Sequence, residues 1–503
     1  MAATETMGID PILNRALNEF TSAMLTLTAG RIHLGAIAEE TKTSDQRHEE
    51  EFKAAKARYA DQLAAVTAEK ELEEKQKYLE KACESRDQYK ESNRFNYKMG
   101  RSLELVVAVV VVCAVALLLG SRAAAAAPVV VSTYNVVSLG GKGDGKTESS
   151  KAFLAAWGKA CSSTNPAVVY VPPGRFLLKN VVFSGQCKNK AITFRIAGTL
   201  VAPTDYRLIG NAANWILFQY VNGVTISGGI LDGQGTSLWN CKNSPKTNCP
   251  PGATTLGFSN SNNVKVLGVT SLNSQMFHIV INGCNNVKLQ GVKITAPGNS
   301  PNTDGIHVQL STGVTILNTK IGTGDDCVSI GPGTANLWIE SVTCGPGHGI
   351  SIGSLGKDAT EAGVQNVTVR TVTFRGTQNG VRIKSWGRES SGFARKIVFQ
   401  HVAMVNVQNP IVIDQNYCPR NDGCPGKVSG VKVSDVTYQD IHGTSATEVA
   451  VKFDCSAVNP CSRIQLQDVK LTFNNNNRIT TAQASCSHAA GTASGMIQPS
   501  SCL

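Results

Sequence analysis

Acidic side chains are scarce in the larger part of this 503-residue sequence. Residues 128–503 contain 18 Asp and Glu against 31 Lys and Arg, which gives a formal charge of +13. A surface with this balance attracts acidic partners over long range. The shortage of negative charge therefore predicts an acidic partner, rather than a basic one, for this region.

Zinc-ligand spacings are also missing, because residues 128–503 contain no CxxC or HxxxH pattern. Instead, many of the 13 cysteines in this region are closely paired along the chain. In an oxidising compartment such spacing predicts local disulfides. The expected pairs are Cys241–Cys249, Cys418–Cys424, Cys455–Cys461 and Cys486–Cys502. An odd number leaves one thiol free, and we expect this to be Cys284, which lies between apolar runs.

An apolar run spans Arg101 to Pro128, with an arginine at its start and an alanine tract at its end. This is the layout of a secretory signal, although it begins well inside the chain. Met99 stands just ahead, so we expect translation of the functional protein to begin there and the signal to be cleaved. An uncleaved signal anchor is the alternative, since about 18 apolar residues can span a bilayer. Both interpretations place residues 128–503 outside the cytosol.

The segment before this run is charged and helical in character. Residues 49–90 contain strong helix formers of both charges and neither glycine nor proline, which predicts a helix of unknown role. The sequence thus divides into a helical segment at 1–98, a signal peptide or anchor at 99–127 and a folded domain at 128–503. Translation from Met99 would leave the first segment out of the protein.

Helical segments are missing from the region after about residue 222, where a short phrase of alternating β-branched residues keeps returning. Its leading valines are Val224, Val264, Val287, Val314, Val367 and Val431. Further coils are expected in the two widest gaps, around Leu337-Trp338-Ile339 and Ile397-Val398-Phe399. Repeats of roughly 20–30 residues, too short to bury their own apolar face, are typical of a stacked solenoid.

Alternation with period two, rich in Val, Ile and Thr, predicts strands as the repeating units. The expected fold is therefore all-β, a parallel β-helix, with a β-sandwich as the alternative. Successive rungs of a β-helix lie about 4.8 Å apart, so equivalent positions line up on an outer face. The open ends need covering. We expect a helix at Ser149–Cys161 to cover the front and the disulfide-rich tail to close the other end.

Polar clusters interrupt the repeats at close to one coil length. They are Asn302-Thr303-Asp304-Gly305, Gly324-Asp325-Asp326, Gly347-His348-Gly349 and Arg382-Ile383-Lys384. Stacking of the coils would bring three carboxylates, an imidazole and two cations onto one face. Each cluster alone is more often a solvated turn or a strand edge, but four in order predict a catalytic site.

Neighbouring carboxylates repel one another, which raises the pKa of at least one and lets it hold a proton. Glycoside hydrolysis needs one protonated acid for the leaving oxygen and one ionised group as base or nucleophile. Arg382 and Lys384 can bind the carboxylate of an acidic sugar. Binding of Ca²⁺ by Asp304, Asp325 and Asp326 is an alternative use of the same oxygens.

At these residues the sequence resembles a known family. The blocks SPNTDGIHV, GTGDDCVSIG, CGPGHGISIGSLG and NGVRIKSW are similar to the four signature blocks of the polygalacturonases, glycoside hydrolase family 28. The resemblance runs from about Tyr134 to the C-terminus and does not cover residues 1–98. It implies a right-handed parallel β-helix and inverting hydrolysis of α-1,4 links between galacturonic acid residues in pectin.

Residue roles follow from this resemblance. Asp325 would be the general acid, Asp304 and Asp326 would activate the attacking water, and His348 would support the protonation of the acid. The implied substrate-binding residues are Asn302 near the cleaved bond, Arg382 and Lys384 on the galacturonate carboxylate, and Tyr417. Inversion requires acid and base carboxylates roughly 6.5–9.5 Å apart.

Further expectations concern the setting of the enzyme. We expect a secreted, monomeric protein of the cell wall that binds pectin, uses no cofactor or metal and binds no nucleic acid. Membrane attachment would arise only through an uncleaved apolar segment. The resemblance to plant members, some of them exo-acting, favours exo over endo cleavage. A Ca²⁺-dependent, pectate lyase-like enzyme and a non-catalytic pectin-binding wall protein are the rival functions.

The adjacent carboxylates of Asp325 and Asp326 restrict the backbone conformation at this point. Neighbours on a regular strand point in opposite directions, so both can face one cleft only if the chain bends near Gly324. We expect Cys327 to pair with Cys344, one coil further on, and to hold this bend.

Overall fold

The computed structural model describes residues 130–244, 248–419, 424–475 and 478–503. The helical segment and the signal or anchor expected before residue 128 lie outside these ranges. Within the described ranges, no helix is both long enough and apolar enough to cross a membrane.

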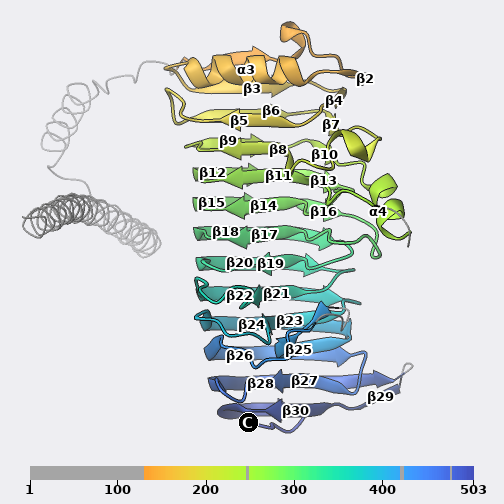
Figure 1. The fold of residues 1–503 in the computed structure, drawn as a ribbon, viewed down its shortest axis with the longest axis vertical. Coiled ribbons are helices and arrows are strands. Elements are labelled where there is room, and N and C mark those ends of the chain that lie inside the picture. Colours follow the sequence, from red (N-terminus) through yellow and green to blue (C-terminus); the bar gives the residue numbers. More distant parts are fainter. Residues whose placement is uncertain (1–129, 245–247, 420–423, 476–477) are drawn as a thin grey trace, which may run out of the picture. The chain divides into compact units, whose positions relative to one another are not determined.

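The described chain winds into a parallel β-helix, with one coil stacked on the next (Figure 1). Eleven strands form one sheet along the stack. They are β5 Val181–Ser184, β8 Asn214–Gln219, β11 Thr254–Ser259, β14 Ile279–Asn282, β17 Ile306–Gln309, β19 Val328–Ile330, β21 Ile350–Leu355, β23 Asn379–Trp386, β25 Asn409–Tyr417, β27 Val449–Asp454 and β30 Gln483–Ser487.

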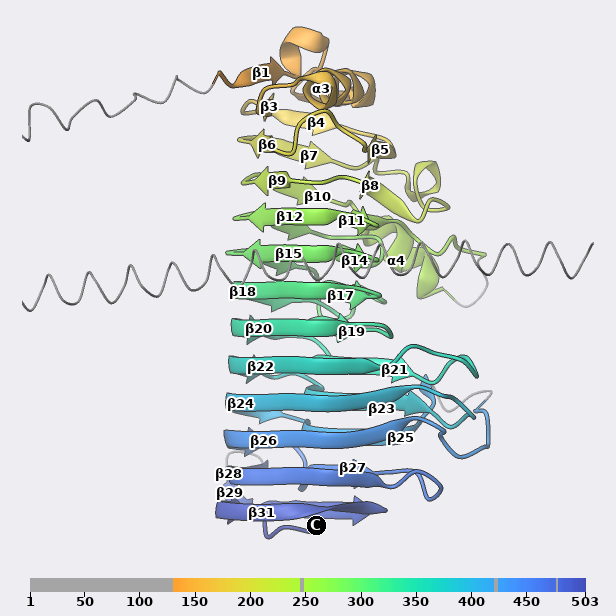
Figure 2. The same cartoon turned by 90° about the vertical axis from the view of Figure 1, so that its left-hand side faces the viewer.

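A second, curled sheet of 20 strands forms the rest of the wall (Figure 2). Its strands are β1 Ser132–Asn135, β2 Asp144–Glu148, β3 Ala167–Val171, β4 Arg175–Leu177, β6 Ile192–Ile196, β7 Thr199–Val201, β9 Val224–Ser227, β10 Ile230–Asp232, β12 Asn262–Leu267, β13 Thr270–Leu272, β15 Asn285–Gln290, β16 Lys293–Thr295, β18 Thr312–Gly322, β20 Ala335–Cys344, β22 Val364–Arg375, β24 Phe393–Val407, β26 Lys432–Ser445, β28 Cys461–Asn475, β29 Arg478–Thr481 and β31 Ala489–Gln498. Only β28 and β29 pair antiparallel among the described strands.

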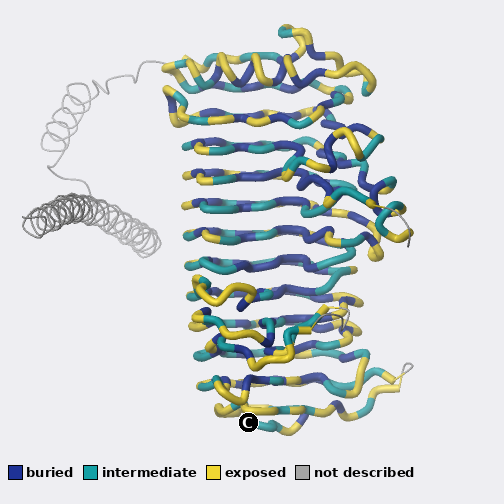
Figure 3. Tube along the Cα trace, viewed as in Figure 1, coloured by how far each residue is buried: buried dark blue, intermediate teal, exposed yellow. Residues whose placement is uncertain are grey.

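Buried residues occur in every part of the stack of coils (Figure 3), and their apolar side chains form a hydrophobic core cluster. The predicted repeats are in register, since Val264 pairs with Val287 and Val287 with Val314. The two expected extra coils are present, at Leu337 and Ile397. Parallel stacking of alternating strands therefore buries the β-branched positions, as the period-two pattern predicts.

One member of the repeat was misaligned. Ile397 stacks on Val436 in β26, whereas Val431 precedes that strand and lies at the corner of the coil. The segment has two alternating apolar pairs, Val431 with Val433 and Val436 with Tyr438, and all four side chains are buried. Alternation alone could not distinguish them, because both pairs have the same period of two.

An amphipathic helix covers the front end, as predicted. Helix α3, Ser150–Ser162, buries Phe153 and Trp157 against the first coils. Trp157 contacts the rings of Phe183, Phe194 and Phe218, so aromatic stacking joins the helix to the strands behind it. The other helices of the described chain are short: α4 Thr236–Lys242, η1 Val137–Leu139 and η2 Tyr206–Leu208. The expectation of no helix after about residue 222 was wrong for α4, which lies between β10 and β11 and interrupts no strand of the repeat.

The C-terminal end is not closed by a separate cap. The tail continues the solenoid, because β30 pairs with β27 and β31 pairs with β28. Most of β31 is exposed, and Cys486–Cys502 ties the last segment to this final rung. The tail thus ends the stack as a cross-linked last coil.

Disulfides hold the turns of the coils. The four predicted close pairs are present, together with Cys327–Cys344. Cys284 is free and buried, as expected. Cys161–Cys187, which joins the end of α3 to the turn after β5, was not predicted. Its cysteines are 26 residues apart, too far for a spacing argument to single them out.

Candidate active site

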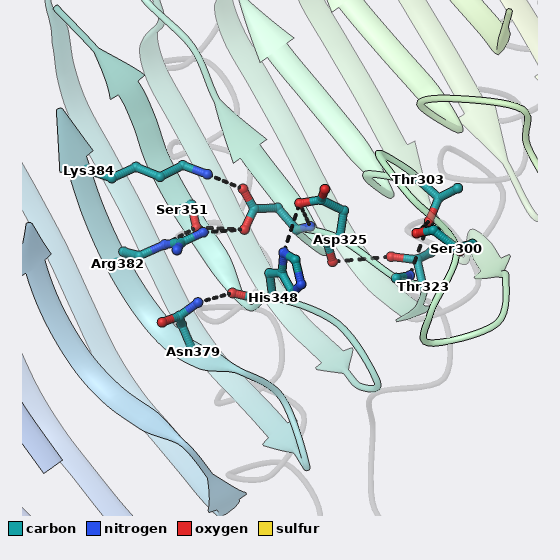
Figure 4. Close-up of polar contacts among 11 residues, drawn as sticks. Ser300, Thr303, Thr323, Asp325, His348, Ser351, Asn379, Arg382 and Lys384 are labelled. Carbon is teal, nitrogen blue, oxygen red and sulfur yellow. Dashed lines mark hydrogen bonds and ion pairs between the residues drawn. The ribbon is translucent and has the colours of Figure 1, made fainter. Parts of the chain in front are cut away.

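The four polar clusters meet on the outer face of the eleven-stranded sheet (Figure 4). The strands at this place are β17, β19, β21, β23 and β25, which run side by side. The sheet register builds one column of outward-facing polar side chains. His307 pairs with Ser329, Ser329 with Ser351, and Ser351 with Arg382. The catalytic candidates stand beside this column, because their motifs occupy the bends that lead into the same strands.

Asp304 lies in the bend immediately before β17 and is 7% exposed. Hydroxyl groups fix this bend. Thr303 Oγ1 lies 2.7 Å from Ser300 Oγ and accepts a hydrogen bond from Gly324 N at 3.1 Å. The backbone carbonyl of Asp304 accepts from His278 N. The bend before β17 is thus bonded directly to the bend before β19.

Gly324, Asp325 and Asp326 lie in a bend between β18 and β19, as the adjacency of the two carboxylates required. An added Cβ at Gly324 would clash with the Ser300 carbonyl oxygen, so only glycine fits there. Asp326 N donates to Asp325 Oδ1 at 2.8 Å, and both side chains line the same cavity. The Cys327–Cys344 disulfide follows directly and joins this bend to the next coil.

Asp325 is paired with His348 from the next coil. His348 Nδ1 lies 3.0 Å from Asp325 Oδ1, and His348 N donates to the Asp325 carbonyl at 2.8 Å. The side chain of His348 is 37% exposed and that of Asp325 is 21% exposed, so both reach the open cleft. Asn379, from the following coil, donates from Nδ2 to the backbone carbonyl of His348 and so fixes the backbone of that residue.

Asp326 lies deeper and is held by two cations. Its side chain is 1% exposed; Oδ2 accepts from Lys384 Nζ at 2.8 Å, and Oδ1 accepts from Arg382 Nη2 at 3.0 Å. Ser351 Oγ donates to Oδ1 at 2.8 Å and accepts from Arg382 Nε. Each carboxylate oxygen of Asp326 thus has a charged donor.

Burial and neighbouring charges shift the pKa values of the two buried carboxylates, Asp304 and Asp326, in opposite directions. Burial raises the pKa of Asp304 well above its usual range, and the negative charges of Asp325 and Asp326 raise it further. Burial also acts to raise the pKa of Asp326, but Lys384 and Arg382 outweigh it and the pKa is lowered. Crowding was expected to raise the pKa of one carboxylate; at Asp304 burial contributes most and the neighbouring charges add to it, and the resemblance assigns this residue to the attacking water rather than to the general acid.

Two cavities meet at these residues. One has a volume of about 430 Å³ and the other about 850 Å³. Both are lined by Asn302, Asp325, Lys384 and Tyr417. Asp304 and Asp326 line the smaller cavity, whereas His348 and Arg382 line the larger one. All eight predicted site residues therefore lie in one cleft, and Asp325 stands where its two halves join.

Tyr417 forms part of the wall beside the cations. Lys384 Nζ lies 5.1 Å and Arg382 Cζ 6.0 Å from the centre of its ring. Trp386 packs edge-on against Tyr417 at 5.5 Å. A ring beside two cations, at the end of β25, provides a surface on which a sugar can stack.

A cation site can be drawn from part of the same cluster. One ligand atom each of Asp325, Asp326 and His348 lies within 4.8 Å of the others. Lys384 and Arg382 already supply positive charge to Asp326, so the arrangement is less suited to a divalent cation than an unpaired cluster would be. Asp304, which the sequence suggested as a third Ca²⁺ ligand, is not among these three.

Sequence reasoning missed the residues of the polar column. Ser351 links Asp326 to Arg382, and Ser329 lines the same cavity as Asp304. His307, in GIHV, lies 2.8 Å from Ser329 Oγ through Nδ1. Alternation marks these positions as outward-facing, but only the strand register reveals which carboxylate each one reaches.

Comparison with known proteins identifies the family. Residues 161–494 match the sequence profile of the Glycosyl hydrolases family 28. A polygalacturonase from Prunus persica is 74% identical over 371 residues, which cover 74% of this chain and 93% of that protein. An exopolygalacturonase from Platanus acerifolia is 44% identical over 372 residues, covering 73% of this chain and 97% of that protein.

A solved structure agrees with the fold. The polygalacturonase from Erwinia carotovora ssp. carotovora matches with a TM-score of 0.54 at 24% identity, covering 68% of this chain and 93% of that one. At this identity the likeness concerns the fold alone. The profile covers most of the β-helix and all four polar clusters, and so this chain belongs to the glycosyl hydrolases of family 28.

Proposed function

We propose that the protein is a polygalacturonase, which hydrolyses α-1,4 links between galacturonic acid residues of polygalacturonate. The observation that carries this proposal is the meeting of three carboxylates and two cations where the two cavities join. Hydrolysis needs the carboxylates, and an acidic polymer needs the cations. The high identity to a polygalacturonase over most of the described chain supports the same substrate.

The proposed reaction inverts the anomeric carbon. Asp325, hydrogen-bonded to His348 and open to both cavities, donates its proton to the leaving glycosidic oxygen. Asp304 and Asp326 hold the attacking water in the smaller cavity. Asp326 stays ionised because two cations bind it, and the raised pKa of Asp304 suits a group that must accept a proton.

Arg382 and Lys384 would serve two carboxylates at once. Each gives a hydrogen bond to Asp326, but an arginine carries five N–H donors and a lysine three. Both side chains line the larger cavity, where their remaining donors could bind a galacturonate carboxylate. Asn302 and Tyr417 would position the sugars next to the cleaved bond.

The general acid can be tested with Asp325→Asn. It should abolish the release of reducing ends from polygalacturonate, while the matched control Asp440→Asn, an exposed aspartate of β26, should keep full activity. Undiminished activity of Asp325→Asn would overturn the acid assignment. Products that absorb in the ultraviolet, formed only with Ca²⁺, would instead indicate a lyase. Binding without any cleavage by the unaltered protein would indicate a wall-binding protein.

We further propose that cleavage is exo-acting. The loop after β21 brings Lys357, Asp358 and Glu361 to the smaller cavity, so two acids stand there against one cation, and Glu361 is fixed by the backbone N–H groups of Gly356 and Lys357. A polyanion extending past this loop would meet like charge. The described lining of the larger cavity contains two cations and no acid besides Asp325, so the polymer would extend there.

The exo proposal predicts galacturonic acid monomer as the sole early product. Chromatography of products during the first few per cent of hydrolysis would check this. A ladder of oligomers at that stage would establish endo cleavage and contradict the proposed role of the loop. The likeness to an exopolygalacturonase at 44% identity supports the exo assignment.

We also propose that the functional protein is a secreted monomer. The arginine, the apolar run and the alanine tract before residue 128 support export, and six disulfides in the described chain support an oxidising compartment. The N-terminal sequence of native protein should begin near residue 128. An intact residue 1–98 segment, or a dimer on a sizing column, would contradict one part of this proposal.

A further inference from the structure

A row of left-handed residues lies near the start of successive long strands of the 20-stranded sheet. Asn336 and Asn366 belong to this row, each with φ 55°, a conformation that asparagine adopts more readily than most residues. Asn366 Nδ2 donates to Asn336 Oδ1 at 2.6 Å, and Asn336 Nδ2 donates to Thr312 Oγ1 at 3.1 Å. The asparagines of the row end at Asn366. The equivalent positions in the next three coils are Lys396, Asp435 and Arg463.

Asn366 also begins an acceptor sequence for an N-linked glycan. Asn366-Val367-Thr368 is the one place in the sequence where Asn-x-Ser/Thr occurs with x other than proline. Val367 is buried, whereas Asn366 is exposed and Thr368 is half-buried on the outer face. Attachment of a sugar would replace one of the two hydrogens on Asn366 Nδ2, and the other could still donate to Asn336. The hydrogen bond of the row is therefore compatible with a glycan.

A groove of about 420 Å³ is lined by Asn366 at one end and by residues of the four following coils. Its strands, β22, β24, β26, β28 and β31, lie side by side (Figure 2). Rungs about 4.8 Å apart make this a distance of about 19 Å from β22 to β31. The floor is a row of outward-facing residues in register, namely Thr368, Val398, Thr437, Gln465 and Thr492.

The groove suits a neutral sugar better than an acidic polymer. Lys396 and Arg463 line it, but so does Asp435, and Arg463 Nη2 donates to Asp435 Oδ2 at 2.8 Å. A polyanion would meet the Asp435 carboxylate and compete with it for the arginine. The hydroxyl and amide groups of the floor can instead hydrogen-bond to the hydroxyl and acetamide groups of a neutral sugar.

We propose that Asn366 carries an N-linked glycan and that the first sugars of this glycan lie in the groove. This rests on the proposed export, because the transfer takes place in the secretory pathway. A bond forms between Asn366 Nδ2 and the anomeric carbon of an N-acetylglucosamine. The bond between that carbon and the diphosphate of a lipid-linked oligosaccharide breaks, the diphosphate lipid leaves, and Nδ2 loses one proton.

Attachment at the end of the groove makes binding of the sugars intramolecular. Short flexible linkage gives an effective concentration in the millimolar range, so a few hydrogen bonds to the floor suffice. The glycan then bridges successive coils from the outside, on the 20-stranded sheet and away from the catalytic cleft of the eleven-stranded sheet. Opening of β26 and β28 would require the sugars to leave the floor, so the glycan should slow it.

The first experiment asks whether the glycan exists. The full sequence, secreted from cultured plant cells, should give a glycopeptide at Asn366 by mass spectrometry. Thr368→Ser keeps the acceptor sequence and should keep the glycan, whereas Thr368→Ala should lose it. An unmodified Asn366 in the unaltered protein would overturn the proposal. If the N-terminus of that unmodified protein began near residue 128, export would stand and only the glycan would be wrong.

The second experiment asks where the sugars lie. Hydrogen exchange of β26 and β28 should be severalfold faster in Thr368→Ala than in Thr368→Ser, although both strands are two or more coils away from the substitution. Exchange of β12 and β15, outside the groove, should be equal in the two proteins. Equal exchange of β26 and β28 would mean that the glycan extends into solvent and would overturn its placement. Protection of these strands in Thr368→Ala by added galacturonate oligomers would make the groove a polysaccharide site instead.

Discussion

Removing Lys384 should expose how much the burial of Asp326 depends on its cations. Lys384→Met keeps a side chain of similar length but takes away the ammonium 2.8 Å from Asp326 Oδ2. Breaking a buried ion pair by deleting one partner costs about 3–5 kcal/mol. Arg382 still binds Oδ1 at 3.0 Å, so we expect the lower end, about 3 kcal/mol of unfolding free energy at pH 7.

The cost should depend on pH in a defined direction. Lys384 and Arg382 lower the pKa of Asp326 against its burial, so their stabilisation is present above the unfolded value of about 3.9 and is lost as pH falls through the folded value. In Lys384→Met, burial is opposed by Arg382 alone and the pKa of Asp326 rises. The difference in stability between the two proteins should therefore be largest near neutral pH and shrink towards pH 3.

Urea unfolding at pH 7 and at pH 3 would measure this. The matched control is Lys452→Met, whose exposed lysine lies 4.0 Å from Asp454 and should change stability by less than about 0.5 kcal/mol. The double variant Asp326→Asn with Lys384→Met should be more stable than the sum of the single changes, by about 1 kcal/mol or more. A cost under about 1 kcal/mol at pH 7, or an equal cost at both pH values, would refute the reasoning.

Two further changes test the bend and the cap. Gly324→Ala should lower kcat by about 100-fold, because its Cβ would meet the Ser300 carbonyl and displace both carboxylates. Gly158→Ala in α3 has open space around its Cβ and should leave kcat unchanged, and equal kcat for the two would contradict the fit at Gly324. Phe153→Ala should destabilise the protein by about 3–5 kcal/mol in urea, whereas Leu154→Ala, 40% exposed, should cost much less. Equal costs for this second pair would show that α3 does not seal the core.

The architecture could be predicted because its cause is local and repeated. Val287 and Val314 occupy equivalent positions in neighbouring coils and are buried for the same reason. The alternation of apolar and polar residues predicts this burial without any knowledge of distant residues. The misalignment at Val431 and the missed pair Cys161–Cys187 have the opposite character. Both depend on the number of residues in the turns between strands, and these lengths vary without a period that the sequence would reveal.

The residues of the site could be predicted from the sequence, but the hydrogen bonds and ion pairs between them could not. Motif spacing places Asp304, Asp325 and His348 on one face, and the structure brings them into one cleft. The partners that divide the carboxylates electrostatically are ordinary strand residues such as Ser329 and Ser351. Serine on an outward strand position is common, so its hydrogen-bond partner becomes evident only once the register is known.

The disulfides have a consequence for how the solenoid can come apart. Their cysteines are separated by between 6 and 26 residues, so each link ties a coil to itself or to its immediate neighbour. No disulfide of the described chain joins the front of the stack to the back. Coils could therefore peel from the exposed β31 end one after another, while those nearer α3 keep both their cross-links and their packing. Each link could equally close as soon as its own stretch of chain has been made, with no need to wait for the C-terminus.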